Sequence, residues 1–370
     1  MSASTRYARS IEPVRTDGRD IDLDVGQLAG EGASQKASGS IEEHLGSMAQ
    51  TWRQLPEAST TDPTYYDRPM LQESIWGWAI PTYYYVGGLT GASLALGAAV
   101  QLKNDPESAG LVRRCHLIGF FGASMSGALL VYDLGRPERF LNMLRVFRPT
   151  SPMNMGAWIL SATAASATGA LLLGRRSGFA GFLGRTAGLA AGIFGLGLAT
   201  YTGVLVANTA VPLWQESRRV LPALFGASAI ASVGCTFDIF CENERQRRIT
   251  NLFGNVGRIA ELAAEVVMER QASTVPRVGR PLKHGLSGMM WRSSELLMAA
   301  SLVISMLPRE TRRRRIAAGV IGTLGSFLLR FTVERAGSAS ARDARASFHQ
   351  QRAGHGAAEV AASSHDIRRR

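Results

Sequence analysis

From Trp76 to Val333 the chain repeats one pattern, in which blocks of apolar or small residues alternate with short, basic connections. Most blocks are about 20 residues long, and a helix of 18 or more apolar residues can cross roughly 30 Å of hydrocarbon. A helix of a soluble protein would carry a polar face, and most of these blocks have none. The pattern therefore predicts an all-α integral membrane protein with about eight transmembrane helices.

The eight predicted spans differ in polarity, and the one at residues 253–268 is the least apolar. It contains Arg258, Glu261 and Glu265, whose spacing places them on one face of a helix. A charged side chain inside a membrane is stable only where it faces the protein interior or an opposite charge. The segment is therefore either a half-buried or interfacial helix, or a span in which these three residues face the bundle interior or each other. The eight spans cover residues 75–101, 112–134, 153–173, 186–208, 221–241, 253–268, 288–307 and 314–333.

Two polar tails flank the apolar region. Residues 1–70 are rich in Ser, Thr, Gly and acidic residues, whereas residues 336–370 are rich in Ala, Ser and Arg. Neither tail has a sustained apolar period, so we expect both to be largely disordered and residues 71–335 to form the transmembrane domain. An even number of spans places both termini on one side of the membrane. The basic connections favour a cytoplasmic location for the opposite face, and hence periplasmic termini, although the face of the termini is also basic.

The excess of basic over acidic residues is explained by the membrane spans. Lys and Arg outnumber Asp and Glu by 41 to 29, which gives a net charge of +12. These basic residues flank the spans, where the positive-inside bias and anionic lipid head groups account for them. The sequence contains no nucleic-acid-binding module, so we expect membrane lipid, and no nucleic acid, as the partner of this charge.

The chain has too few ligands to carry a redox metal of its own. Its three cysteines, Cys115, Cys235 and Cys241, form no CxxC motif, and an iron–sulfur cluster requires four thiolates. His116 is the one histidine expected inside a span, whereas a bis-His haem requires two. We therefore expect no iron–sulfur cluster, no haem and no metal site in this chain. The sequence also shows no catalytic motif such as Walker A or HExxH.

Three segments carry the most specific information. Trp76–Gly91 opens a helix with interfacial aromatic residues and continues into a small-residue face. Tyr132–Phe140 closes the second span with an Asp-Leu-Gly-Arg-Pro turn that contains Asp133 and Arg136. Ser151–Trp158 opens the third span with a serine at the N-cap and a proline at the first helical position. The Asp133–Arg136 pair is either a structural clasp that fixes the turn or part of a proton-handling site.

These three segments resemble the NrfD/PsrC family, the membrane subunits of polysulfide reductase and related complexes. The turn at Asp133, followed by the helix start at Ser151, is the most specific part of the resemblance. The similarity covers roughly residues 72–335 and is strongest over residues 76–232. The resemblance implies two four-helix bundles in the bacterial inner membrane.

The resemblance also implies a function. Family members bind a quinone or quinol and exchange electrons with an iron–sulfur, ferredoxin-like subunit, which adjoins a molybdopterin or multihaem catalytic subunit. By this resemblance the chain is the quinone-interacting membrane anchor of a respiratory oxidoreductase complex, with menaquinone or ubiquinone as its bound substrate. Some relatives are proposed to move protons as well, which leaves coupling to proton transfer open.

The resemblance and the chemistry of quinones together select candidate site residues. A quinone takes up two electrons and two protons on reduction, so its pocket needs an apolar slot, hydrogen-bond donors and a proton route. Tyr83 and Tyr84 occupy the part of the first helix where the family places quinone contacts, and Tyr201 lies at a matching position in the fourth. Asn208 and Asn154 are further candidate donors with weaker support than the tyrosines. Each tyrosine could equally be an interfacial anchor.

Asp133, Arg136 and His116 are the candidates for proton handling. Asp133 and Arg136 lie together at a membrane edge, where an acid is a functional candidate by default. His116 lies about 25 Å from Asp133 along a helix, so it could serve only another part of a proton path. Its alternative role is that of a packed, neutral imidazole. The first helix carries no histidine, although some relatives use one there, which puts the ligand set in question.

Two other functions remain open. Charges within the predicted spans, among them Asp238 and Arg258, would also fit an ion- or proton-translocating membrane module. A chain that lacks a complete quinone site would instead be a structural anchor for a peripheral complex. An adjacent subunit with iron–sulfur clusters would favour the electron-transfer function over both.

Overall fold

The computed structural model describes residues 20–22, 27–29, 71–74, 76–134, 138–240, 243–308, 311–344 and 346–347. We expected both tails to be largely disordered, and most residues of the two tails lie outside the described ranges. The chain divides into two compact units, residues 1–61 and 62–370. Within the first unit, strands β1 (Asp20–Asp22) and β2 (Gln27–Ala29) form an antiparallel pair.

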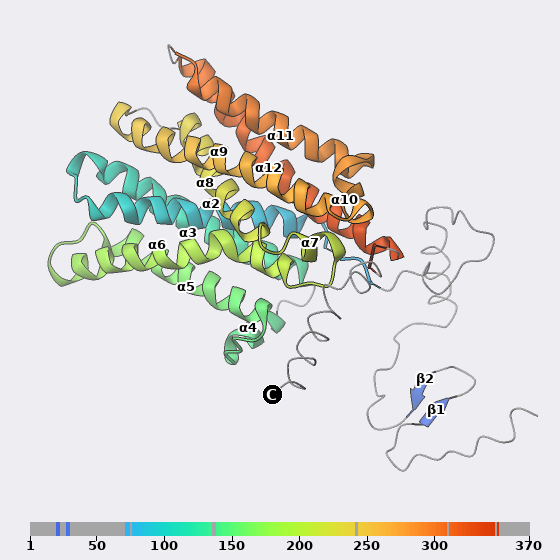
Figure 1. Ribbon diagram of the computed structural model, residues 1–370. Coiled ribbons are helices and arrows are strands. Elements are labelled where there is room, and N and C mark those ends of the chain that lie inside the picture. The colour runs from blue at the N-terminus through green and yellow to red at the C-terminus, as the bar shows by residue number, and fades with distance from the viewer. Residues whose placement is uncertain are drawn as a thin grey trace, which may run out of the picture. The chain divides into compact units, whose positions relative to one another are not determined.

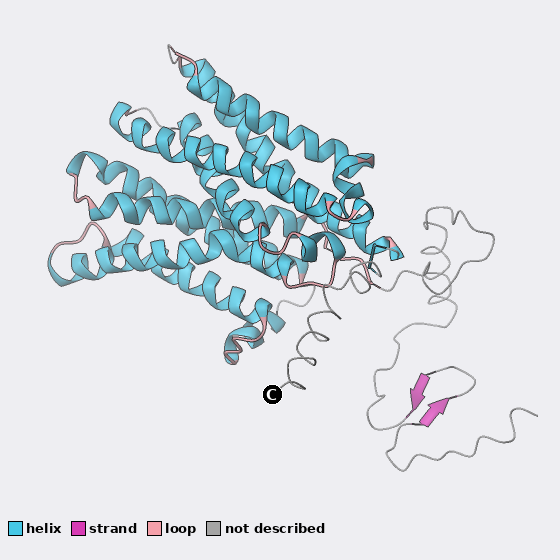
Figure 2. Ribbon diagram, in the orientation of Figure 1, coloured by secondary structure: helices cyan, strands magenta, loops and turns pink. Residues whose placement is uncertain are grey.

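The second unit is helical throughout its regular elements, as Figures 1 and 2 show. In chain order its elements are α2 (Ala79–Leu102), the 3-10 helix η3 (Pro106–Ser108), α3 (Ala109–Asp133), α4 (Glu138–Arg145), α5 (Pro152–Leu173), α6 (Gly178–Ala207), α7 (Pro212–Glu216), α8 (Leu221–Phe240), α9 (Glu244–Ser273), α10 (Pro276–Lys283), α11 (Gly285–Met306) and α12 (Arg312–Arg342).

The long helices of the described chain form two four-helix bundles (Figure 1). Helices α2, α3, α5 and α6 pack against one another in the first bundle, and α8, α9, α11 and α12 do so in the second. The bundles meet where α2 and α6 contact α8, and where α2 contacts α12. The short helices α4, α7 and α10 lie in the connections. This arrangement is the one that the resemblance implied.

Six of the long helices are apolar enough to cross a membrane by length and composition, namely α2, α3 together with η3, α5, α6, α8 and α12. Their outward faces carry large apolar side chains. On α6, Phe179 exposes 79% of its surface and Ile193 exposes 71%. Such apolar surface is a liability in water but is stable against lipid. The chain is therefore an all-α, multi-pass integral membrane protein, as the hydrophobic pattern predicted.

Helices α9 and α11 occupy the places of the sixth and seventh predicted spans, and both are less apolar than the other six. Helix α9 is also longer than the predicted span of residues 253–268, because it begins at Glu244 and ends at Ser273. Arg258, Glu261 and Glu265 are all buried in it. The alternative in which these charges face the bundle interior is confirmed.

The last helix extends further than the sequence predicted. Helix α12 continues to Arg342, past the boundary at residue 335, where a disordered tail was expected to begin. The residues beyond this boundary are small, and a Cβ added at Gly337 would overlap the indole ring of Trp214 in α7. The Ala-, Gly- and Ser-rich composition that suggested disorder thus serves close packing. The predicted boundary is too early.

Glycine sets the closest helix contacts in both bundles. A Cβ at Gly91 of α2 would overlap the carbonyl oxygen of Gly195 in α6, so only glycine permits this approach. Gly234 of α8 and Gly254 of α9 face each other in the same way in the second bundle. Helix packing by small residues, expected for a protein in lipid, therefore holds α2 against α6 and α8 against α9.

Candidate functional site

A cavity of about 350 Å³ lies at one end of the first bundle. Its wall is built where α2 and α5 begin and where α3 and α6 end, with α4 closing one side. Most of its lining is apolar or aromatic, as in a typical pocket for a small organic ligand. The lining residues are Trp76, Ile80, Tyr83, Tyr84, Leu130, Asp133, Leu134, Phe140, Met143, Pro152, Met153, Gly156, Ala157, Tyr201, Leu205, Asn208 and Thr209.

The structure brings five of the predicted site residues to this one cavity. Tyr83 and Tyr84 come from α2, Asp133 is the last residue of α3, Tyr201 lies on α6, and Asn208 follows the end of α6. The sixth, the arginine of the Asp-Leu-Gly-Arg-Pro turn at position 136, lies outside the described residues. Its pairing with the aspartate thus stays a prediction.

The tyrosines of the cavity differ in what their hydroxyls contact. The Tyr201 hydroxyl donates to the backbone carbonyl of Pro152, at the start of α5. Tyr84 exposes only 1% of its surface, and its hydroxyl has no hydrogen-bond partner within the described part of the chain. Buried polar groups are almost always hydrogen-bonded, so a lone donor in a cavity points to a ligand. Tyr84 is therefore the tyrosine best placed to donate to a bound molecule.

An aromatic cluster joins this cavity to the second bundle. The ring of Trp76 stacks on that of Trp214, with 5.9 Å between the centroids and 17° between the planes. Trp76 also meets Tyr84 edge to face at 6.3 Å, and Tyr84 lies 5.8 Å from Phe225 of α8. The indole N–H of Trp214 donates to the carbonyl of Val333 in α12 at 2.9 Å. The ring of Tyr84 is thus held from both bundles.

The two asparagine candidates have different positions. Asn208 lines the cavity, and its side-chain amide donates to the carbonyl of Val204 at 2.9 Å. Asn154 does not line it. Its side chain accepts from the backbone N–H of Arg148 at 2.7 Å and donates to the carbonyls of Met143 and Val146. Asn154 therefore holds the connection between α4 and α5, and its candidacy as a ligand donor was wrong.

Sequence reasoning missed the contribution of α4. Phe140 and Met143 of this short helix line the cavity. The segment Glu138–Arg145 is strongly amphipathic, which is the pattern of a helix that lies along an interface. That pattern could have identified α4 as a cover for the end of the bundle.

His116 lies apart from the other candidates for proton handling. It lines a second pocket, which is formed by the end of α2, the start of α3 and the connection between α5 and α6. This is the opposite end of the first bundle from Asp133. The two residues therefore belong to different sites, as their separation along the helix predicted.

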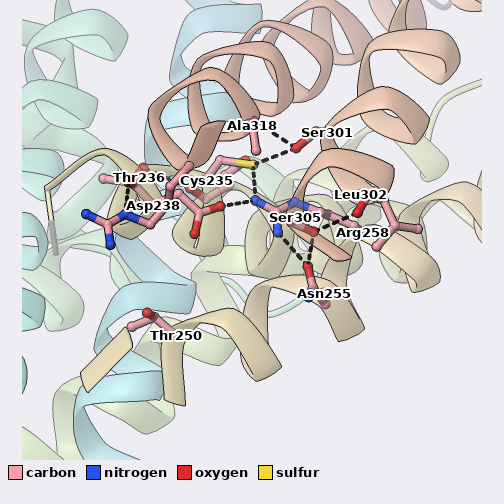
Figure 3. Close-up of polar contacts among 12 residues, drawn as sticks. Cys235, Thr236, Asp238, Thr250, Asn255, Arg258, Ser301, Leu302, Ser305 and Ala318 are labelled. Carbon is pink, nitrogen blue, oxygen red and sulfur yellow. Dashed lines mark hydrogen bonds and ion pairs between the residues drawn. The ribbon is translucent and has the colours of Figure 1, made fainter. Parts of the chain in front are cut away.

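The second bundle contains a buried polar cluster, drawn in Figure 3. Arg258 of α9 forms an ion pair with Asp238 of α8, and their side chains expose 0% and 2% of their surfaces. The Arg258 guanidinium also donates to Asn255 Oδ1 at 2.6 Å and to Cys235 Sγ at 3.3 Å. Ser305 of α11 donates to the same Asn255 oxygen at 2.8 Å. The cluster thus ties three helices together, α8 to α9 through the guanidinium and α9 to α11 through Asn255.

More buried charge lies further along the same helices. Ser326 of α12 donates to both carboxylate oxygens of Glu261, at 3.2 and 3.3 Å. Glu265 is fully buried, and neither of its carboxylate oxygens has a partner among the described residues. Arg330 of α12 donates to the carbonyl of Phe225 at 2.9 Å and lies 4.0 Å from the centroid of its ring. Arg330 is not among the predicted site residues, although an arginine inside an apolar span is itself a marker of a functional or structural site.

Fold and site together define a class of protein. The chain is a multi-pass helical membrane protein with an aromatic-lined cavity in one four-helix bundle and a buried charged cluster in the other. The sequence matches the family described as polysulphide reductase, NrfD, over residues 68–276, which is more than half of the chain. The chain belongs to this family, and membership indicates a membrane subunit of a respiratory oxidoreductase. No curated protein matches the chain.

Proposed function

We propose that the chain is the quinone-interacting membrane subunit of its complex and that a quinone head group binds in the cavity at Tyr84. The observation that carries this proposal is the buried Tyr84 hydroxyl, which belongs to a residue lining an apolar cavity and has no partner in the described part of the chain. A quinone offers what this site lacks, namely a flat apolar ring with carbonyl oxygens that accept hydrogen bonds.

The chain's own residues supply three parts of the proposed reaction. The apolar and aromatic wall holds the ring and excludes water from it. The Tyr84 hydroxyl donates to one carbonyl oxygen and so stabilises the charge that builds on it as electrons arrive. Asp133 is exposed and also lines the cavity, so it can exchange protons between the bound ring and water. Reduction of the bound quinone consumes two electrons and two protons and gives a quinol, and oxidation of a quinol at the same site releases them again.

The electrons must be exchanged with a neighbouring subunit. The proposed partner is an iron–sulfur subunit that docks at the end of the bundle where the cavity lies, with a molybdopterin or multihaem catalytic subunit beyond it. Phe147 and Val146 are exposed in the connection that follows α4, and they offer an apolar contact beside the cavity. Menaquinone and ubiquinone both carry the carbonyl groups that this site would bind.

The Tyr84→Phe variant tests the quinone site. We expect the KM for quinol to rise about fivefold to tenfold, because a neutral hydrogen bond contributes roughly 1 kcal/mol or slightly more. Turnover of quinol by the assembled complex in its native membrane is the measurement. Tyr85→Phe is the matched control, since Tyr85 is the next residue of α2 and packs against Phe327 outside the cavity. An unchanged KM in Tyr84→Phe, or an equal rise in the control, would contradict the proposal.

A second function, proton transfer through the second bundle, rests on a different observation. Glu261, Glu265 and Arg330 form a buried series of ionisable groups that begins near the ring of Phe225, which itself contacts Tyr84. Ionisable residues inside a membrane are typical of proton relays. We propose that these residues carry protons in step with quinone chemistry.

A further inference from the structure

The pocket around His116 is a candidate site of a different kind. It has a volume of about 280 Å³ and lies where α2 ends, α3 begins and the connection between α5 and α6 passes. Figure 1 shows these two connections at the same end of the first bundle. Three arginines line the pocket, Arg113 from α3, Arg175 from the connection and Arg185 from α6.

The charge of this pocket is strongly positive. Among the described residues, none of its three arginines forms an ion pair. The one carboxylate in the lining, that of Asp105, already binds Arg245 at 3.0 Å and accepts from the Ser108 hydroxyl at 2.8 Å. It therefore does little to neutralise the arginines. A pocket with three uncompensated guanidinium groups favours an anion.

A buried polar group lines the pocket. His116 exposes only 6% of its surface, and its Nε2 atom has no hydrogen-bond partner in the part of the chain that the structure describes. Beside it, Gln101 donates to the carbonyl of Arg185 at 2.7 Å and so fixes α2 against α6. A Cβ at Gly188 would overlap Gln101 Oε1 and lie 3.2 Å from His116 Nε2, so glycine leaves room for both side chains. The buried imidazole of His116 and the guanidinium groups of the three arginines can together contact several oxygens of one phosphate.

The surroundings favour a lipid as the source of that phosphate. Leu102, Leu172 and Leu183 are exposed, and each is next in the sequence to a residue that lines the pocket. Val112 and Leu171 line the pocket itself. A phosphate in this pocket would thus lie next to apolar side chains that the acyl chains of a lipid can contact. Basic pockets between membrane helices are typical binding sites for anionic head groups.

We propose that this pocket binds the phosphate of an anionic phospholipid, held by Arg113, Arg175 and Arg185 with His116 beneath them. The lipid would join the two helical hairpins of the first bundle, α2–α3 and α5–α6, at the end opposite the quinone cavity. The proposal stands on this pocket alone and does not depend on the quinone site.

Native mass spectrometry of the full, purified chain tests it. The delipidated protein is titrated with phosphatidylglycerol or with phosphatidylcholine, and inorganic phosphate is tested separately as a competitor. The test variant is Arg113→Gln with Arg175→Gln. The control is Arg114→Gln with Arg176→Gln, which removes the same charge from adjacent exposed residues that do not line the pocket.

We expect the wild type and the control to bind phosphatidylglycerol in preference to phosphatidylcholine. The test variant should lose that binding on the order of 20-fold, since each basic residue near an anionic lipid contributes roughly fivefold to affinity. An equal loss in the control variant would overturn the proposal, because it would show a general effect of charge. Binding of inorganic phosphate alone, without phosphatidylglycerol, would overturn the assignment to a lipid.

Discussion

Tyr201 shows how one contact shapes the proposed quinone cavity. Its hydroxyl donates to the carbonyl of Pro152, and its ring lies directly against Gly156, one turn further along α5. A Cβ at Gly156 would overlap the ring. Glycine at this position therefore lets a side chain of α6 reach across to α5 and form one wall of the cavity.

Replacing Gly156 with alanine should displace the Tyr201 ring into the cavity. Overpacking of this kind costs about 1–3 kcal/mol, so we expect the KM for quinol to rise about tenfold or more in a complex that still assembles. Gly127→Ala is the control, because a Cβ there meets nothing within 4 Å. Quinol titration of both variants gives the answer. Equal KM values would show that the cavity is not where quinol binds.

Residue types and motifs predicted which side chains of the cavity come together, but not how each is used. Tyr83, Tyr84 and Tyr201 could be selected from their positions in apolar helices and from the resemblance. That the hydroxyl of Tyr201 is engaged by a backbone carbonyl, while that of Tyr84 is not, depends on how α5 is rotated against α6. Periodicity identifies a buried face of a helix, but it does not identify the atom that the face will meet.

At the scale of helices, α8 and α9 are joined by glycine contacts and by one buried ion pair. The Asp238 and Arg258 side chains are almost fully buried. A buried pair gains little net stability over an apolar pair of similar volume, but the loss of one partner leaves an uncompensated charge. The pair therefore fixes the register of the two helices more than it strengthens their contact.

The buried pair is tested by a double-mutant cycle. Asp238→Leu alone should destabilise the protein by about 3–5 kcal/mol, because the Arg258 guanidinium then lacks its counter-charge. Asp238→Leu combined with Arg258→Met should recover most of the loss. Thermal unfolding in detergent is the measurement. A double variant that is as unstable as the single one would contradict this account of the pair.

Whole helices were predicted more reliably than their ends. The charges of α9 identified it as the most polar of the eight helices, and the alternative that placed its charged face inward is confirmed. The end of α12 was misjudged because small residues that pack on Trp214 have the same composition as a disordered tail. The cover that α4 forms over the cavity was missed because the segment between the second and third spans was treated only as a connection, although its eight residues are amphipathic.

At the scale of the molecule, the two bundles are coupled through aromatic rings. Tyr84 of the first bundle contacts Phe225 of the second. The Arg330 guanidinium lies over the Phe225 ring, 4.0 Å from its centroid. Quinone chemistry at Tyr84 therefore takes place close to the buried series that leads to Glu261 and Glu265. This proximity is what supports proton transfer through the second bundle.

Glu265→Gln separates the two proposed activities. We expect quinol turnover to persist in this variant, while proton uptake by proteoliposomes slows about tenfold or more, because an amide cannot relay a proton. Glu244→Gln is the control, since Glu244 is exposed at the start of the same helix, where it pairs with Arg248. Unchanged proton uptake in Glu265→Gln would exclude this residue from a proton path.

The central claim, that a quinone binds in the cavity of the first bundle, is tested most directly by photolabelling the assembled complex with an azidoquinone and mapping the modified peptides. The account predicts label on residues 76–84 of the α2 region and on residues 201–209 at the end of α6, with suppression by excess unmodified quinol and weakening in Tyr84→Phe. Label confined to the second bundle, or label that unmodified quinol does not suppress, would contradict it.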